Sequence, residues 1–323
     1  MAAVGTDRSV PPIRARRRIA GASAVLLVHT ADGVVDWDAT EAHIERTVAA
    51  GLTPAVNMDT GFVQLLDVAT RHRVLDVTHR VAGRDFVAGA YVADAPGDAF
   101  AADRYLDECD AIAARGGTPV IFPSHGLNAL DDDALVSALA TIGRGVDRFI
   151  GFELGTMFVP YGRIYSIDAY RGMLDIAACI GAKHSSLDRA AEWERIVLRD
   201  AHRPDFAVMT GNDLAIDGVM WGADYLLGLS TFAPDAFAAR DAAWADGDVA
   251  RFLELNDVLQ YLGHFTFRSP VPGYRHNAAQ WFVLRGWAAA DTVPTAAPTR
   301  PTSDVDVLTE LHARLCTTMG VDR

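Results

Sequence analysis

The sequence predicts a (β/α)8 barrel of the TIM-barrel class, followed by a helical C-terminal extension. Short apolar runs recur along the chain, helical patterns lie between them, and the first five intervals are each about 30 residues long. A strand and a helix of this combined length form the right-handed crossover that joins two parallel strands. Eight such units close into a barrel.

The apolar runs that we interpret as strands include residues 25–28 and 206–209, which are continuously apolar, as strands buried on both faces should be. The predicted strands begin near Ala24, Pro54, Phe86, Thr118, Arg148, Cys179, Asp205 and Asp224. An open, doubly wound sheet is the alternative. It fits less well because it usually needs fewer units and because no G-x-G-x-x-G motif follows the first strand.

The helical patterns set the expected domain organisation. Between the strands they cover residues 39–50, 63–81, 101–115, 132–142, 167–177 and 187–201. The alternation stops after about Phe232, and further helices are predicted over residues 234–263, 276–290 and 305–319. We therefore expect a disordered N-terminal segment at 1–19, a barrel at 20–233 and a helical extension at 234–323.

Composition limits the class of partner. The net charge of −13 argues against nucleic acid, which favours a basic surface. The sequence has no uninterrupted apolar run long enough to span a bilayer, so no membrane partner is expected. Cys109, Cys179 and Cys316 are widely spaced and follow neither a metal-ligand nor a disulfide pattern, which favours a reducing, cytoplasmic location.

Lys183 ends the sixth apolar run, just before a helical pattern. Barrel active sites lie at the carboxyl ends of the strands, so its amine would point into the mouth of the barrel. Burial there would lower the pKa of the lysine and leave a neutral amine able to attack a carbonyl. The alternative is a surface lysine at a strand end. His184 alternates with Lys183 and should face away from the barrel axis.

Other polar residues follow the same ends of the predicted strands. The candidates are Asp59, Thr60, Gly61, His125, Glu153, Tyr161, Arg163, Tyr165, Asp213 and Ser230. Arg163 is either a clamp for a carboxylate or phosphate or a solvated loop residue. His125 is either an acid or base or an ordinary loop histidine.

The segment Gly181-Ala182-Lys183 resembles the Schiff-base lysine segment of the dihydrodipicolinate synthase and N-acetylneuraminate lyase superfamily. Asp59-Thr60-Gly61 is similar in spacing to that family's G-T-T-G-E loop, which holds a keto-acid carboxylate. Residues 209–213 resemble its segment after strand seven. The order of the segments and the helical tail also match, over roughly residues 20–320.

The resemblance implies a class I lyase, an aldolase or dehydratase, that forms an imine between Lys183 and pyruvate or another 2-oxo acid. Thr60 and the Gly61 backbone would hold the carboxylate, and neither a metal nor an organic cofactor would be required. Asp213 resembles a sugar-hydroxyl ligand, although an Asp here is also a common helix N-cap. Ser230, by the same comparison, is expected to be structural. The family also implies a homodimer or homotetramer.

Two departures from the family pattern stand out. Asp59 replaces a threonine, and its carboxylate would repel a keto-acid carboxylate unless it is protonated or turned away. Phe152 or Met157 takes the place of the strand-five tyrosine that relays protons. Tyr161, Tyr165 or Glu153 would then have to move protons.

Two other functions stay open from the sequence. Asp59, His125, Glu153 and Asp213 could assemble the open site of a metal-dependent lyase or isomerase. The barrel could also be a binding protein that has lost its chemistry, since fold does not imply function. The segment 274–277 would either contact a neighbouring subunit or cap the site, and the sequence does not decide between these.

Overall fold

The computed structural model describes residues 10–321 and contains a closed barrel of eight parallel strands in sequence order. The strands are β1 (Gly21–Ala24), β2 (Thr53–Val56), β3 (Val87–Ala90), β4 (Thr118–Ile121), β5 (Phe149–Leu154), β6 (Cys179–Ser185), β7 (Ala207–Thr210) and β8 (Asp224–Leu227). β1 pairs with β8 and thereby closes the barrel. The predicted TIM-barrel fold with a helical C-terminal extension is therefore confirmed.

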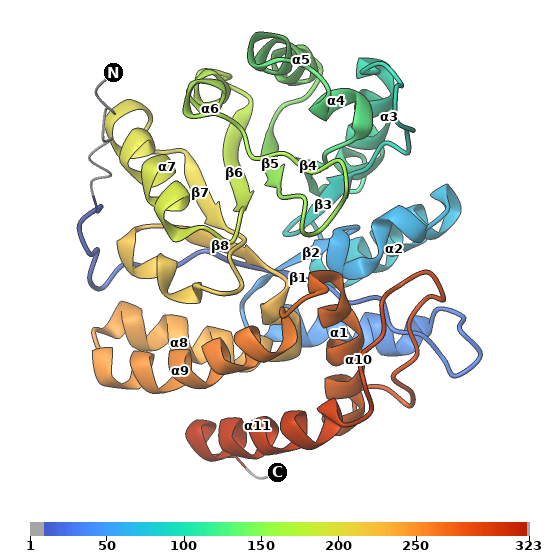
Figure 1. Cartoon of the computed structure of the whole chain (residues 1–323), viewed down its shortest axis with the longest axis vertical. Helices are drawn as coiled ribbons and strands as arrows, with labels where there is room; N and C mark the ends of the chain where they lie inside the picture. The colour runs from blue at the N-terminus through green and yellow to red at the C-terminus, as the bar shows by residue number, and fades with distance from the viewer. Residues whose placement is uncertain (1–9, 322–323) are drawn as a thin grey trace.

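Helices surround the barrel (Figure 1). Those of the barrel are α1 (Trp37–Ala49), α2 (Val68–Ala82), α3 (Ala102–Ala113), α4 (His125–Asn128), α5 (Asp132–Arg144), α6 (Ile167–Leu174), α7 (Arg189–His202) and α8 (Pro234–Asp246). Short 3-10 turns follow several strands: η1 (Asp59–Gly61), η2 (Val63–Leu65), η3 (Ile216–Trp221) and η4 (Leu229–Phe232). Helix α8 packs beside α1 and completes the ring, so the domain boundary that we expected at residue 233 separates β8 from its own helix.

The remaining extension comprises α9 (Val249–Thr266), η5 (Val271–Gly273), α10 (Tyr274–Leu284) and α11 (Asp304–Met319). Helix α9 packs between α8 and α11, and α10 packs against α11 and reaches the turn η4 that follows β8 (Figure 1). The loop before α10 is held by Arg300, whose Nη2 donates to the carbonyl oxygens of Thr266, Arg268 and Pro270 at 3.0, 2.6 and 2.9 Å. The start of α10 therefore has a defined place relative to the barrel.

The first strand differs from its prediction. β1 ends at Ala24, and the apolar run 25–28 lies beyond it, although it is buried. Side-chain hydroxyls satisfy part of this backbone: Thr231 accepts from the Leu26 N–H at 3.2 Å, and Thr40 from the Val28 N–H at 3.1 Å. An apolar run with its N–H groups bonded to side chains does not need a neighbouring strand.

Two helices also differ from their predictions. The expected helix over 63–81 is interrupted, because Phe62 adopts left-handed backbone and Asp67 caps a new helix by accepting from the Thr70 N–H. The helix expected over 276–290 begins at Tyr274 and ends at Leu284, ahead of Gly286 with its positive φ of 66°.

The expected N-terminal disorder at 1–19 falls partly on residues 1–9, which lie outside the described residues. Residues 10–19 are not disordered, since they line the amino end of the barrel. The Arg14 N–H donates to Met220 O at 2.8 Å, and the Arg17 guanidinium pairs with Asp224 at 2.7 Å. No helix in residues 10–321 has both the length and the apolarity needed to cross a membrane.

The interface between β5, β6 and α7 contains a fully buried ionic network. The Glu153 carboxylate accepts from Arg195 Nη2 at 2.7 Å and pairs with His184 Nδ1 at 2.7 Å. Burial acts to raise the pKa of Glu153, but the charges and hydrogen bonds of His184 and Arg195 outweigh it and lower the pKa to about 2. The network holds two strands and a helix together on the outer face of the barrel.

We expect Glu153→Gln to lower the free energy of unfolding by about 3–5 kcal/mol at pH 7, because it leaves Arg195 buried without its charge partner. The control Glu254→Gln, at an exposed ion pair with Arg251, should change it by less than about 0.5 kcal/mol. Urea unfolding followed by circular dichroism measures both. Equal stability of the two variants would contradict a structural role for the network.

The same carboxylate predicts a pH effect. Its folded-state pKa is depressed, so its contribution is complete above its ordinary pKa of about 4.5 and is lost as pH falls through about 2. The stability difference between wild type and Glu153→Gln should therefore shrink over this window. A constant difference from pH 7 to pH 2 would contradict the depressed pKa.

Candidate active site

Lys183 lies on the inner face of β6, paired in register with Phe152 of β5 and Met209 of β7. Its side chain is 7% exposed, and its Nζ lies 4.5 Å from the centre of the Phe152 ring. Burial lowers the pKa of Lys183 to about 8, and the charges of Asp213 and Asp59 oppose this shift. A substantial fraction of the amine is therefore neutral near physiological pH.

Lys183 is also the only lysine in the sequence. Every other basic side chain of the Lys/Arg class is an arginine, which cannot lose its proton in a protein and does not act as an amine nucleophile. That the chain has a single lysine can be seen in the sequence alone, but the predictions above did not use it. It separates Lys183 chemically from all the other cations of the chain.

Gly211, just past the end of β7, makes room for the amine. A Cβ at this position would lie 2.8 Å from Lys183 Cε and 2.1 Å from Ser185 Oγ. The Gly211 N–H donates to His184 O at 2.8 Å, which ties the end of β7 to β6. A side chain at residue 211 would therefore displace the lysine.

Asp213 follows Gly211 and is also buried. Its Oδ1 accepts from the Leu229 N–H at 2.7 Å, so it joins the loop after β7 to η4 and does not cap the turn that follows it. Burial raises the pKa of Asp213 to about 7, against the effect of its backbone donors and of Lys183. An amine and a carboxyl group that both titrate near neutrality thus lie at the ends of neighbouring strands.

The loop after β2 forms the other side of the site. Thr60 Oγ1 shares a hydrogen bond of 2.7 Å with the Tyr274 hydroxyl. The Asp59 carboxylate accepts from Gln64 Nε2 at 3.0 Å and from Arg275 Nη1 at 3.3 Å. Gly61 does not offer its N–H to a ligand as we expected, because that N–H donates to Met58 O at 3.0 Å. A Cβ at Gly61 would lie 3.1 Å from Val25 O, so the residue allows close packing.

Tyr161 and His125 lie together on a third side. Their ring centres are 4.3 Å apart, and Asn128 Nδ2 donates to Tyr161 O at 2.8 Å. The Tyr161 hydroxyl shares a hydrogen bond with Tyr91, which follows β3. Burial raises the pKa of Tyr161 well above its ordinary value, so it is a protonated phenol, and it packs against the inner apolar cluster of the barrel.

Four predicted site residues lie elsewhere. Glu153 faces outward in the network with Arg195, and Tyr165 packs in the same layer, where its hydroxyl donates to Phe152 O at 3.2 Å. Neither residue is placed for the predicted proton-moving role: alternation along β5 turns Glu153 from the mouth, and Tyr165 packs in the outer apolar cluster. The Arg163 guanidinium is occupied by Asp132 and Leu130 O, so it is not a free clamp. The Ser230 hydroxyl donates to Leu227 O at 2.9 Å and is structural.

The predicted metal-ligand set does not assemble. Within residues 10–321, no group of three or more His, Cys, Asp or Glu side chains is arranged to hold a metal ion. Asp59 and Asp213 lie at the mouth, but Glu153 points to the outer layer. The cysteines at 109, 179 and 316 are buried free thiols.

Three further residues lie at the site although they were not among the predicted site residues: Tyr91, Tyr274 and Arg275. Tyr91 directly follows β3. Residues 274–277 were left between two roles, and the structure decides that Tyr274 and Arg275 contact the loop after β2. The signal available in the sequence was the polar cluster just after the proline-containing loop.

Comparison with known proteins agrees with the family resemblance found in the sequence. No family model matches the chain. The 4-hydroxy-tetrahydrodipicolinate synthase of Rhodospirillum centenum is 26% identical over 298 residues, which are 88% of this chain and 95% of that protein. Among solved structures, YagE from Escherichia coli K12, a member of the dihydrodipicolinic acid synthase family in complex with pyruvate, superposes with a TM-score of 0.77 at 18% identity, covering 92% of this chain and 98% of that chain.

A Ruminococcus gnavus sialic acid aldolase has a TM-score of 0.75 at 14% identity, covering 94% of this chain and 99% of that chain. Fold and site together define a (β/α)8 barrel with a buried lysine at the carboxyl end of strand six. The resemblance found in the sequence is confirmed. The chain is similar in sequence to a 4-hydroxy-tetrahydrodipicolinate synthase, and similar in fold to a member of the dihydrodipicolinic acid synthase family and to a sialic acid aldolase.

The lowered pKa of Lys183 predicts the pH dependence of its reaction with carbonyl compounds. Only the neutral amine attacks, so the rate of imine formation should rise with pH and reach half of its maximum near pH 8. Timed samples quenched with borohydride at one fixed pH, and analysed by intact mass, give this rate. In Asp213→Asn the midpoint should fall below that of the wild type, because the Asp213 charge raises the pKa of the amine. A midpoint near 10.5 would contradict burial of Lys183.

Proposed function

We propose that this protein is a class I, lysine-dependent lyase that acts on a 2-oxo acid such as pyruvate or a sugar-derived keto acid. The observation that carries the proposal is the single lysine of the chain, buried at the carboxyl end of β6 with a pKa of about 8. Three similar proteins support the class: a 4-hydroxy-tetrahydrodipicolinate synthase, a sialic acid aldolase and a member of the dihydrodipicolinic acid synthase family in complex with pyruvate.

In the proposed reaction the neutral amine of Lys183 attacks the ketone carbon of the 2-oxo acid, and loss of water gives a protonated imine. The imine withdraws electrons from the adjacent carbon, which permits a carbon–carbon or carbon–oxygen bond to form or break. Asp213 is close enough to act electrostatically on the amine, and its pKa of about 7 suits proton transfer during dehydration.

The carboxylate of the 2-oxo acid would lie at the loop after β2. The Tyr274 hydroxyl has one proton, for which Thr60 Oγ1 at 2.7 Å and Asp59 Oδ2 at 3.3 Å compete. With this proton in the shorter contact, the Thr60 hydroxyl keeps its own proton to donate to the carboxylate. Gly61 supports this loop through close packing and does not supply a donor.

Tyr161 is the proposed proton carrier for the rest of the reaction. Of the three groups suggested by the sequence, it alone lies in the inner cluster of the barrel, whereas Glu153 and Tyr165 lie in the outer layer. Tyr161 shares a hydrogen bond with Tyr91, so the Tyr91 hydroxyl oxygen is a second site to which a proton can move.

Assembly into a homodimer or homotetramer and a cytoplasmic location stay predictions. Light scattering of the purified protein tests the first.

The proposal predicts a covalent adduct that forms at one residue only. The protein is incubated with pyruvate and then with a panel of 2-oxo acids, reduced with borohydride and analysed by intact mass and peptide mapping. We expect one adduct at Lys183, and none in Lys183→Ala or in the charge-preserving Lys183→Arg. Since no other lysine is present, background modification is restricted to the chain terminus. Binding of an acid without any adduct would instead support a non-catalytic barrel.

A further inference from the structure

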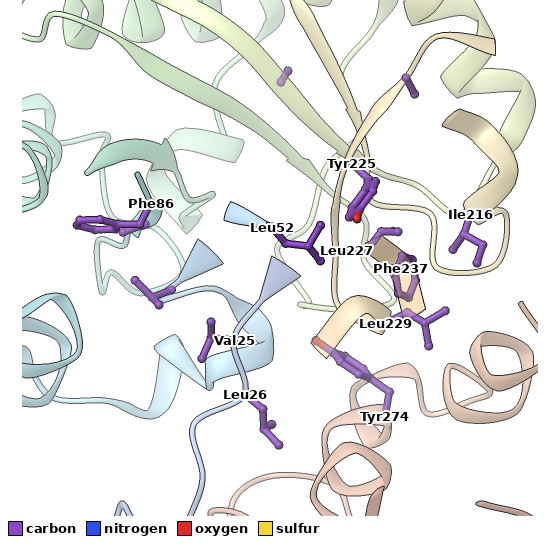
Figure 2. Packing of buried hydrophobic residues seen from close by; sticks show 14 of the residues in the cluster. Val25, Leu26, Leu52, Phe86, Ile216, Tyr225, Leu227, Leu229, Phe237 and Tyr274 are labelled. Carbon is purple, nitrogen blue, oxygen red and sulfur yellow. The ribbon is translucent and has the colours of Figure 1, made fainter. Parts of the chain in front are cut away.

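The C-terminal extension reaches the proposed active site. Tyr274 and Arg275, at the start of α10, contact Asp59 and Thr60, which lie more than 200 positions earlier in the chain. Figure 2 shows Tyr274 reaching from α10 towards the segment that follows β8. These contacts belong to this chain's own loop and tail, and the inference drawn from them rests on the proposed function.

Asp59 poses an electrostatic problem for that function. It is adjacent to Thr60, the proposed donor to the keto-acid carboxylate, and it is 5% exposed. Two carboxylates close together in a site of low dielectric repel each other strongly. A loop with an unpaired aspartate would therefore bind a 2-oxo acid poorly.

Arg275 offsets this repulsion by placing a positive charge beside Asp59. Its Nη1 donates to Asp59 O at 3.1 Å and to Asp59 Oδ1 at 3.3 Å, and its Nε donates to Pro272 O at 3.1 Å. The guanidinium also lies 4.9 Å from the centre of the Phe62 ring. Arg275 is 7% exposed, so little water screens the charge that it places beside Asp59.

Tyr274 completes the arrangement from the same turn. Its hydroxyl lies 2.7 Å from Thr60 Oγ1 and 3.3 Å from Asp59 Oδ2. Its ring stacks on Phe267, with centres 4.2 Å apart and an angle of 15° between the planes. A Cβ at Gly228 would approach the Tyr274 ring to 3.1 Å, so the absence of a side chain there leaves space for the ring.

We propose that Arg275 and Tyr274 are positioning residues through which the C-terminal extension makes the loop after β2 able to accept a 2-oxo-acid carboxylate. Arg275 neutralises Asp59 and turns its carboxylate aside. Tyr274 fixes the rotamer of the Thr60 hydroxyl, which then faces the substrate. The extension thus acts on substrate binding through Asp59 and Thr60, without contacting the reacting carbon.

The test measures the pyruvate concentration that gives half-maximal borohydride trapping at Lys183. In Arg275→Gln this concentration should rise about tenfold or more, because Asp59 loses the positive charge beside it, while the trapping rate at saturation changes less. Asp59→Asn/Arg275→Gln should return it to within about threefold of the wild type, because the repelling charge is gone. Asp59→Asn alone should also stay within about threefold.

A matched control lies at the other end of α10. Arg285 pairs with the exposed Asp235 at 2.7 Å, so Arg285→Gln removes an arginine from the same helix without touching the loop after β2. It should leave half-saturation unchanged. If Arg275→Gln does not fold, Arg275→Lys decides: retention of the charge should keep half-saturation within about threefold, and a larger rise overturns the proposal.

The outcomes separate the two hypotheses. Absence of any adduct in the wild-type protein would count against the proposed function itself. An adduct at Lys183 with the same half-saturation in wild type and Arg275→Gln would overturn the role of the extension alone. A rise in Arg275→Gln that Asp59→Asn does not reverse would indicate lost packing and would also overturn it.

Discussion

The alternation of side chains along β6 is the constraint on which the site depends. Because successive residues of a strand face opposite sides, Lys183 can point into the barrel only if His184 points outward. The outward position has a dedicated partner, since His184 Nδ1 pairs with Glu153 at 2.7 Å and Glu153 pairs with Arg195 of α7. A shift of one residue in register would bury the lysine among helices and place the histidine in the mouth. The outer network therefore secures the inner chemistry.

The electrostatic character of the mouth follows from burial more than from any one charge. Burial is the largest cause of the lowered pKa of Lys183 and of the raised pKa of Asp213. The ordinary pKa values of a lysine and an aspartate lie far apart. The two shifts bring the pKa of Lys183 to about 8 and that of Asp213 to about 7. A more open mouth would restore both groups to their usual charged states and remove the neutral nucleophile.

Sequence periodicity was sufficient for the barrel, because eight strand-and-helix units have few other ways to bury their apolar faces. It also located Lys183, Asp59 and Thr60, which stand directly at strand ends. It misplaced Glu153 because being at a strand end does not decide which face a residue occupies. Tyr165 and Arg163 were misjudged because they follow an irregular segment after β5 whose path depends on tertiary contacts with Asp132 and Arg195. Arg275 could not be placed from sequence, since its partner is more than 200 residues away.

The meeting of the loop after β2 with the start of α10 has a consequence for how the site comes into existence. Such a contact closes one of the longest loops available in this chain, and contacts of high sequence separation form late in folding. During synthesis, the lysine and its barrel can be in place while the partners of Asp59 have yet to emerge from the ribosome. Under the proposed function, the carboxylate site is then complete only after α10, which begins at residue 274 of 323, has been made and has docked on the loop after β2.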